Sequence, residues 1–322
     1  MPEAVIYGKA NAQQKKELEQ LSSKVAAQSK RRNYYKTGKP KIYFVGFDGT
    51  WNNRYDINQG PETNVSLIET LAQRTIASVG GKSTYYQGVG TSGKKMIDVL
   101  DGATGTTVSH IAREAASDFQ SWARAEFEND SQLDIRIGCV SFSRGAIAHT
   151  EFLNNIYDEG VGKKGTEIYE EVYDEYSIVP LRKLAGYSEY WIKPNTLLLG
   201  SHFMIDRVAG KIRPDKRKRV LPCAADLEVI HIRAKNEYRL EFASESLQNP
   251  DTTINPRFTE IDVAGAHSNL GGGYDKNGIA DYILEAGIQF FRTRGLNLDA
   301  APLGHQIGDQ ACKEIVLTGV NL

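Results

Sequence analysis

Short apolar segments alternate with segments of helical periodicity along most of the chain. Residues 42–47 form a continuous apolar run that stops at Asp48, Gly49 and Thr50, as is typical of a strand buried on both faces. Further strands are expected at residues 85–90, 133–140, 196–205, 229–232 and 260–263, and helices at residues 64–79, 107–128, 144–157 and 280–294. Strands that alternate with helices predict an α/β fold of three layers with a mainly parallel sheet.

The first forty residues are more basic than the rest. Leu18, Leu21 and Val25 recur at helical spacing and predict one amphipathic helix over residues 12–32. Residues 1–40 are therefore interpreted as an N-terminal helical extension of a larger domain, residues 41–322. The apolar face of this helix either packs on the domain edge or contacts a partner or a membrane; the basic residues at its end complement the helix dipole and favour packing.

Composition excludes several classes of protein. The 39 Lys and Arg balance 40 Asp and Glu, which argues against a general nucleic-acid binder. Cys139, Cys223 and Cys312 lie far apart without a CxxC pair or metal-ligand spacing, so neither a disulfide framework nor a zinc module is indicated. No metal and no cofactor are expected. No apolar run reaches the ~18 residues of a transmembrane helix. Without a signal peptide at the N-terminus, the protein is expected in the cytoplasm of the producing cell, or outside it by a route that needs no such signal.

The most informative motif follows the strand predicted at residues 133–140 and opens a helix. Its sequence, Ser141-Phe142-Ser143-Arg144-Gly145, has the form of a nucleophile elbow, in which small residues flank a serine on a strained turn. Ser141 stands where the first glycine is usual, which weakens the bare pattern, whereas the strand–turn–helix setting strengthens it. Ser143 is therefore the candidate nucleophile.

A serine hydroxyl needs a base within hydrogen-bond reach and an acid that orients the base. In α/β-hydrolases these residues follow the serine in the order Asp or Glu, then His. Asp206 ends the apolar run at residues 196–205, and His267 lies in a glycine-rich loop after a strand. The other five histidines fall within predicted helices or strands or in a late loop, so Asp206 and His267 are the candidate acid and base.

The oxyanion formed during acyl transfer needs two backbone N–H donors. One is expected from Arg144, which follows the nucleophile, and the other from Gly49 or Thr50 after the first strand. Asp48 either supports this site or simply caps the turn at the strand end. The aromatic residues near these motifs, which either line an acyl pocket or belong to the core, are Trp51, Tyr85, Tyr86 and Phe142.

Seven motifs occur in one order along residues 41–295. They are DGTWNN at residues 48–53, Thr63-Asn64, the tyrosine-rich GVGT at 85–91, SFSRGA at 141–146, Ile205-Asp206-Arg207-Val208, HIRAKNEYRLEF at 231–242 and AGAHSNLGGGY at 264–274. Together they resemble the α/β-hydrolase-like domain family that includes type VI secretion lipase effectors. The chain departs from the family pattern at Ser141, Asn236, Ala264 and Asn269, and Asn269 places in doubt any role of the family's aspartate beside the histidine.

The resemblance implies that residues 41–322 are a catalytic domain with the triad Ser143, Asp206 and His267, supported by Asp48, Ser141, Gly145 and Asn269. It implies phospholipase A-type hydrolysis of a glycerophospholipid, delivery into the periplasm of a target cell, and an immunity protein and a secretion-apparatus component as partners. Three alternatives stay open: a serine hydrolase of soluble esters or thioesters, a non-catalytic binding or assembly protein on a hydrolase-like scaffold, and, most weakly, a metal-assisted hydrolase using Asp48 and Asp206.

Overall fold

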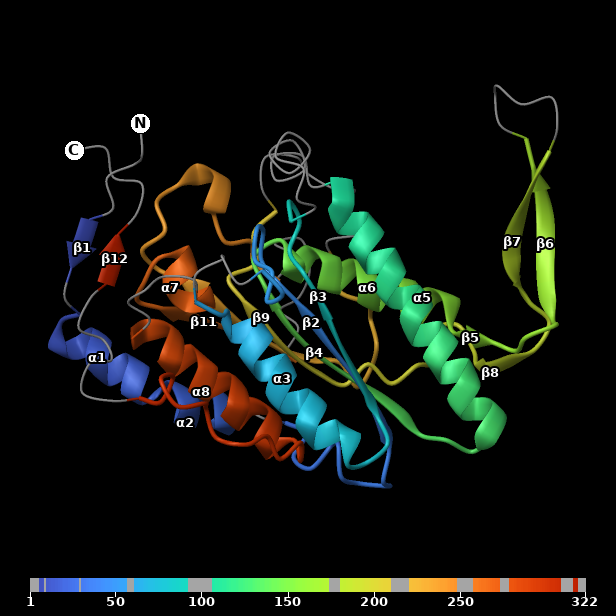
Figure 1. The fold of residues 1–322 in the computed structure, drawn as a ribbon, viewed down its shortest axis with the longest axis horizontal. Helices are drawn as coiled ribbons and strands as arrows, with labels where there is room; N and C mark the ends of the chain where they lie inside the picture. Colours follow the sequence, from blue (N-terminus) through green and yellow to red (C-terminus); the bar gives the residue numbers. More distant parts are fainter. Residues whose placement is uncertain are drawn as a thin grey trace.

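A six-stranded parallel sheet organises the molecule (Figure 1). The structure, a computed structural model, describes residues 6–8, 10–28, 30–56, 61–91, 106–173, 180–209, 220–247, 257–272, 278–307 and 315–317. In space the strands follow the order β11-β10-β9-β4-β2-β3, and every neighbouring pair is parallel. Their bounds are β2 (Lys41–Phe47), β3 (Lys82–Tyr86), β4 (Ile135–Phe142), β9 (Ser201–Ile205), β10 (Glu228–Ala234) and β11 (Phe258–Val263). The expected α/β class with a mainly parallel sheet is confirmed.

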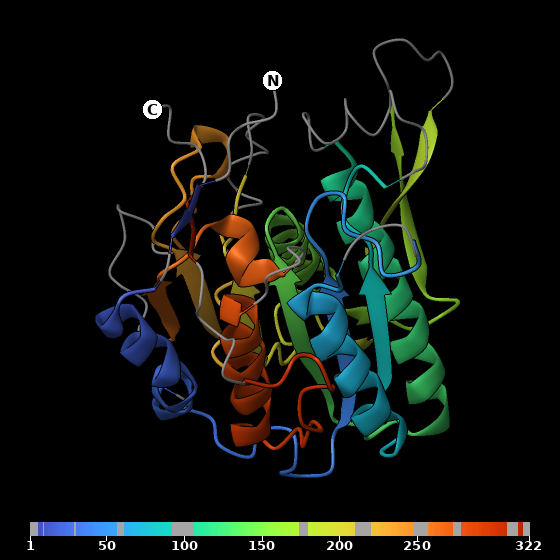
Figure 2. The ribbon, with the colours of Figure 1, turned by 60° about the vertical axis from the view of Figure 1, so that its left-hand side comes forward.

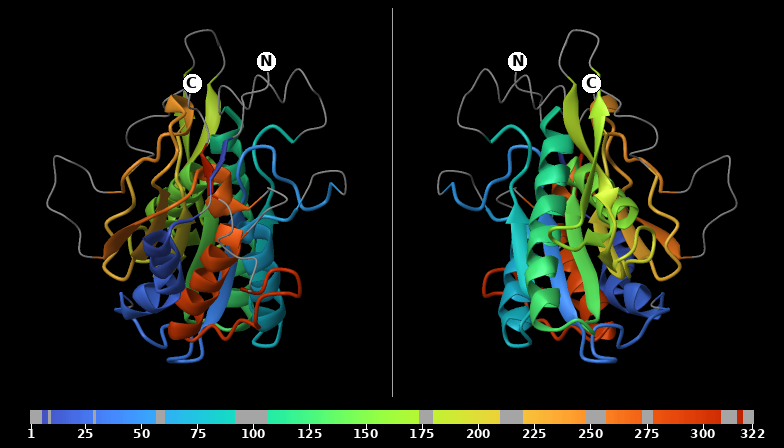
Figure 3. Two further views of the ribbon diagram at one scale, coloured as in Figure 1. Left: turned by 90° about the vertical axis from the view of Figure 1, so that its left-hand side faces the viewer. Right: turned by 90° about the vertical axis from the view of Figure 1, so that its right-hand side faces the viewer.

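Helices cover both faces of this sheet (Figures 2 and 3). On one face lie α2 (Leu21–Ala27), α3 (Asn64–Ala77) and α8 (Gly278–Thr293), and on the other lie α5 (Thr106–Asn129) and α6 (Gly145–Glu159). Side chains that alternate along β4 divide between the two cores: Val140 packs with the first set of helices, and Ile137 and Cys139 with the second. This is the three-layer arrangement that the periodicity predicted.

The bounds of three predicted elements were wrong. The helix expected over residues 12–32 is two helices, α1 (Ala12–Glu19) and α2, which meet at Gln20. The strand expected at residues 85–90 is β3, which ends at Tyr86. The strand expected at residues 196–205 begins only at Ser201, because Gly200 has a φ of 82° and breaks the extended backbone.

The apolar face of the N-terminal helices packs on the domain. Leu18, Leu21 and Val25 are buried in the core that α8 also lines, and α2 contacts α8 along its length. Tyr34 and Tyr35 continue the attachment, with the Tyr34 hydroxyl donating to Asp226 at 2.8 Å. Of the two uses considered for this face, the structure shows packing against the domain.

Several short elements have no counterpart in the sequence prediction. Among them are an antiparallel pair of β1 (Ile6–Gly8) with β12 (Ile315–Leu317), a small pair of β5 (Val161–Gly162) with β8 (Tyr190–Ile192), and the hairpin of β6 (Glu167–Val172) and β7 (Leu181–Tyr187) that projects from the body (Figure 1). Two further short elements are the 3₁₀ turn η2 (Leu240–Phe242) and the helix α7 (His267–Gly271). Within the described part of the chain, no helix has both the length and the hydropathy needed to cross a membrane.

Candidate active site

Three polar side chains come together at the carboxyl end of the sheet. Ser143 directly follows β4, Asp206 directly follows β9, and His267 opens α7 after β11. Figure 2 shows α7 above the carboxyl ends of the strands. Because β4 and β9 are neighbours in the sheet, their ends bring the hydroxyl and the carboxylate to one place.

Two hydrogen bonds join these residues into one chain. His267 Nε2 lies 2.8 Å from Ser143 Oγ, and His267 Nδ1 lies 2.7 Å from Asp206 Oδ2. All three residues are buried. The structure therefore brings together the three residues that the sequence nominated, with the imidazole between the hydroxyl and the carboxylate. In this geometry the imidazole can take the hydroxyl proton while the carboxylate stabilises the resulting charge.

The turn at Ser143 has the backbone of a nucleophile elbow. Ser143 has a φ of 58°, a region that non-glycine residues seldom adopt, and its N–H donates to the carbonyl of Ile205 at 3.1 Å. A Cβ atom at Gly145 would lie 2.4 Å from the carbonyl oxygens of Phe47 and Asp48, so only glycine fits there. The tight turn presents the Ser143 hydroxyl to His267.

The side chain of Ser141 points away from the triad, toward His149 on α6. Its Oγ lies 2.9 Å from His149 Nδ1, His149 Nε2 lies 2.9 Å from His202 Nδ1, and His202 Nε2 lies 2.9 Å from the Leu199 carbonyl. The carbonyl only accepts, so His202 must donate to it, His149 must donate to His202, and Ser141 must donate to His149. This chain gives the Ser141 hydroxyl a partner on the side of the sheet that α6 covers.

The same cluster contains the residues best placed to hold a metal ion. Ligand atoms of Cys139, His149 and His202 lie within 4.8 Å of one another, a grouping found by searching the described residues. Burial lowers the pKa of His202 to about 3 and that of His149 well below its ordinary value, and it raises the pKa of Cys139. Each imidazole nitrogen is already taken by the hydrogen-bond chain, so an ion would have to break that chain.

Asp206 is held from its backbone and from its carboxylate. Its N–H donates to the Ile232 carbonyl at 2.7 Å, and its Oδ1 accepts the Ala234 N–H at 2.9 Å. Burial raises the pKa of Asp206, but the hydrogen bond from His267 and the attraction of its imidazole outweigh burial, so the pKa lies below its ordinary value. Asp206 is therefore ionised and faces His267 with one oxygen.

The loop that carries His267 is fixed by Asn269 and Glu237. Asn269 Oδ1 accepts the Ala266 N–H at 3.0 Å, so the asparagine braces the turn from within. Glu237 Oε2 accepts the His267 N–H at 3.2 Å and is itself held by Arg239 at 2.8 Å. Sequence reasoning assigned Glu237 no role; its place in the motif at residues 231–242 was the available signal.

Two aromatic rings enclose the imidazole. The Phe142 ring stacks on His267 with centroids 4.6 Å apart, and the Phe242 ring lies 5.1 Å away at a steeper angle. A Cβ atom at Gly271 would lie 2.2 Å from the Phe142 ring, which shows how closely that ring is packed. Phe142 therefore supports the base. The hydroxyls of Tyr85 and Tyr86 instead donate to Asp48 and Asp118, and Trp51 is 51% exposed.

Asp48 and Gly49 shape the loop beside the elbow. The Gly49 N–H donates to Asp48 Oδ1 at 2.7 Å, whereas Asp48 Oδ2 accepts the hydroxyls of Thr63 at 2.7 Å and Tyr85 at 2.6 Å. Burial raises the pKa of Asp48 to about 6 against these three hydrogen bonds. Because the Gly49 N–H already has an acceptor, Thr50 is the remaining candidate of the two oxyanion donors expected from this loop, and the N–H of Arg144 stays the other expected donor.

The comparisons with known proteins bear on the fold alone. No protein-family model matches the sequence, and no curated protein matches it. A crystal structure of an uncharacterized protein from Pseudomonas aeruginosa is similar over 92% of this chain, at 15% identity and a TM-score of 0.52. The chain covers 52% of that protein, about half its length. An acetyl xylan esterase structure matches at 10% identity and a TM-score of 0.32, over 79% of this chain and 96% of that one. The likeness to the first of these structures supports the three-layer α/β fold with a mainly parallel sheet.

Proposed function

We propose that the protein is a serine hydrolase of carboxylic esters, with Ser143 as nucleophile, His267 as general base and then general acid, and Asp206 as the orienting carboxylate. The observation that carries this proposal is the continuous chain of hydrogen bonds through His267, at 2.8 Å to Ser143 and 2.7 Å to Asp206. A hydroxyl held by an ordered imidazole–carboxylate pair is the arrangement that activates serine.

The reaction has two halves. Ser143 Oγ attacks the ester carbonyl carbon as its proton passes to His267 Nε2, and the oxyanion is stabilised by the N–H groups of Arg144 and Thr50. The C–O bond to the alcohol then breaks, and the alcohol leaves with the proton from His267. Water attacks the acyl-enzyme with His267 again as base, and the acid product leaves as Ser143 Oγ recovers its proton.

The substrate class that we propose is the acyl ester of a glycerophospholipid, cleaved as by a phospholipase A. Support for this substrate comes from the motif resemblance, because the triad alone suits any accessible ester. A soluble ester or thioester is the alternative. An enzyme for lipid aggregates gains rate when its substrate passes from monomers to micelles, whereas one for soluble esters shows no such gain.

The decisive experiment compares the wild type, Ser143→Ala and the control Ser188→Ala, which changes an exposed serine of the projecting hairpin region. A fluorophosphonate should label the wild type and Ser188→Ala and leave Ser143→Ala unlabelled. Turnover of esters should fall by roughly 10⁴–10⁶ in Ser143→Ala only. A wild type that neither labels nor turns over ester would favour a binding or assembly protein on this scaffold, and equal labelling of all three proteins would show that the reactive nucleophile is not Ser143.

Product analysis then tests the substrate. Mixed phospholipids incubated with the wild type should release free fatty acid and lysophospholipid, detected by mass spectrometry, and Ser143→Ala should release neither. Hydrolysis of short soluble esters without any phospholipid product would support the alternative.

We further propose that the activity serves as an antibacterial toxin delivered by a type VI secretion system, with an immunity protein protecting the producer. This part rests on the resemblance alone. Directing the protein to the periplasm of a susceptible bacterium should stop growth, and Ser143→Ala should not. Normal growth with active wild-type enzyme in the periplasm would contradict the toxin role and leave the hydrolase intact.

A further inference from the structure

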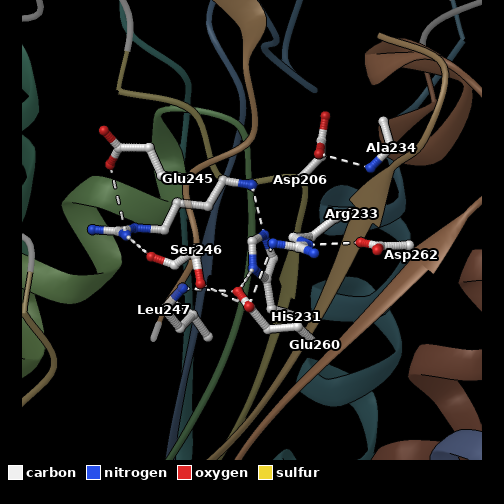
Figure 4. A network of polar contacts seen from close by, with 10 residues as sticks. Asp206, His231, Arg233, Ala234, Glu245, Ser246, Leu247, Glu260 and Asp262 are labelled. Carbon is white, nitrogen blue, oxygen red and sulfur yellow. Dashed lines mark hydrogen bonds and ion pairs between the residues drawn. The ribbon is translucent and has the colours of Figure 1, made fainter. Parts of the chain in front are cut away.

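A second imidazole, that of His231, lies near the triad aspartate Asp206 (Figure 4). His231 is completely buried on β10, and its Nε2 accepts the backbone N–H of Arg207 at 3.0 Å. Arg207 is the residue that follows Asp206, so this hydrogen bond fixes the peptide on the carboxyl side of the triad aspartate. None of the steps above uses His231.

The backbone at Asp206 needs such a restraint. Asp206 has a φ of 39°, in the left-handed region that is costly for a residue with a side chain. Its own N–H is held by Ile232, and the following N–H is held by His231. Without the second bond, the turn could relax toward an ordinary φ and carry the carboxylate away from His267.

The direction of the hydrogen bonds fixes the tautomer of His231. A backbone N–H can only donate, so Nε2 must be unprotonated and the ring proton must lie on Nδ1. That proton is donated to Glu260 Oε1 at 3.1 Å. Burial lowers the pKa of His231 and outweighs the attraction of Glu260 and Asp206, so the ring is neutral, as the geometry requires.

Glu260 is itself well anchored. It lies directly across from His231 in the pairing of β10 with β11. Its carboxylate accepts the Leu247 N–H and the Ser246 hydroxyl, both at 2.8 Å, and lies 3.4 Å from Arg233 Nη1 (Figure 4). Burial raises the pKa of Glu260, but these donors and His231 together lower it to about 2. The carboxylate is therefore charged and holds the His231 ring in one orientation.

We infer that His231 and Glu260 form a second imidazole–carboxylate pair, whose work is to position Asp206 for catalysis by accepting the Arg207 N–H. Strand β10 thus holds Asp206 at three points: the Ile232 carbonyl accepts its N–H, the Ala234 N–H donates to Oδ1, and His231 accepts the N–H of the next peptide. His231 and Glu260 are positioning residues, since neither touches Ser143, His267 or substrate. The inference rests on the proposed role of Asp206.

The two amide replacements of His231 separate its two hydrogen bonds. In His231→Gln the side-chain oxygen can occupy the place of Nε2 and still accept the Arg207 N–H. In His231→Asn the side-chain nitrogen can occupy the place of Nδ1 and still donate to Glu260, but nothing reaches Arg207. The variants have similar polarity and differ in which contact survives.

The experiment measures kcat, KM and the thermal midpoint of unfolding for both variants on a short soluble ester. His231→Asn should lower kcat about 10–100-fold with KM within twofold, because a small displacement of a catalytic group has an effect of that order. His231→Gln should restore kcat to within about fivefold of the wild type. Equal kcat values in the two variants, with both proteins folded, would overturn the inference.

A second pair of variants serves if His231→Asn does not fold. Glu260→Gln keeps an acceptor for the Nδ1 proton and should keep kcat within a few-fold, whereas Glu260→Ala removes it and should lower kcat with KM unchanged. Unchanged kcat in folded Glu260→Ala would contradict the positioning role. Failure of the proposed function is distinct, because the wild type itself would then neither turn over ester nor label with fluorophosphonate.

Discussion

Two of the three residues of the candidate triad have a strained backbone. Ser143 and Asp206 both have positive φ angles, 58° and 39°, at the ends of neighbouring strands. Each such residue costs about 1–3 kcal/mol and persists only where surrounding contacts hold it. The N–H groups of both residues donate to strand carbonyls, of Ile205 and Ile232. Hydrogen bonds to the sheet thus hold the two strained turns that orient the hydroxyl and the carboxylate toward His267.

Replacing Asp206 by Asn should show that its charge and its orientation both matter. The remaining oxygen would keep the Ala234 N–H, and the new amide would donate toward His267 Nδ1. His267 would then carry its proton on Nε2 and could not accept the proton of Ser143. We expect kcat to fall by about 10⁴. Stopped assays beside circular dichroism would check this, and a loss under tenfold in a folded variant would argue against the triad.

Ser141→Gly should restore the usual glycine at little catalytic cost. The Ser141 hydroxyl faces His149, away from the triad, so we expect kcat to stay within about threefold of the wild type. The variant leaves the buried Nδ1 of His149 without its donor, which costs about 1–3 kcal/mol of unfolding free energy. Urea unfolding and ester turnover measure the two effects separately. A large loss of kcat with unchanged stability would show that Ser141 acts in the reaction.

The sequence could nominate the triad but not its supports. Ser143, Asp206 and His267 each follow a predicted strand, and their order along the chain selects them from many serines, acids and histidines. His231 could not be selected, because it looked like an ordinary core histidine within a strand. Its hydrogen bond to Arg207 depends on the parallel register of β10 with β9, which periodicity does not reveal. The same holds for Glu237 under the His267 loop.

At the scale of elements, strands buried on both faces were the easiest to predict. Their continuous apolar runs mark β2, β4 and β10 clearly, because the parallel sheet is covered on both sides. The hairpin of β6 and β7 was missed for the opposite reason. Ile168, Tyr169, Leu181 and Leu184 are each more than 40% exposed, so neither strand has a buried face to give an alternating pattern.

The projecting hairpin should open far more readily than the central sheet. A two-stranded ribbon without a covered face is marginally stable in water. We expect the backbone amides of β6 and β7 to exchange with deuterium within the earliest time points, whereas those of β4 stay protected. Hydrogen exchange read by mass spectrometry compares them in one sample. Protection of β6 equal to that of β4 would mean that something covers the hairpin in solution.

The pair of His231 on β10 and Glu260 on β11 should make the free energy of unfolding fall at acidic pH. The pKa of Glu260 is about 2 in the folded protein against an ordinary 4.5, so the unfolded chain takes up this proton first as the pH falls. The stabilisation is present above pH 4.5 and is lost as the pH falls toward about 2. Glu260→Gln should therefore flatten the fall of unfolding free energy across this window. Glu128→Gln, at an exposed residue of α5, should follow the wild type.

At the scale of the whole molecule, the N-terminal helices belong to the fold that carries the site. The α2 helix buries Leu21 and Val25 against α8. In turn, α8 packs on β9, the strand that Asp206 directly follows. Further along, the backbone N–H of Lys30 donates to Glu228 on β10 at 2.9 Å. Through α8 and Lys30, these contacts link α2 to both strands that position the triad carboxylate, so within the described residues no gap in packing lies at residue 40.

Shortening one buried side chain of α2 tests whether the N-terminal helices unfold together with the rest of the domain. Leu21→Ala removes a side chain that is 1% exposed, and it should cost about 2–5 kcal/mol of unfolding free energy through lost burial and the cavity left behind. Lys24→Ala, on the exposed side of the same helix, should change the unfolding free energy by less than about 0.5 kcal/mol. Because the loss in Leu21→Ala comes from a core shared with α8, urea unfolding should remain a single transition, followed equally by far-ultraviolet circular dichroism and by ester turnover. A separate early transition that leaves turnover intact would instead show that the N-terminal helices fold as an independent appendage.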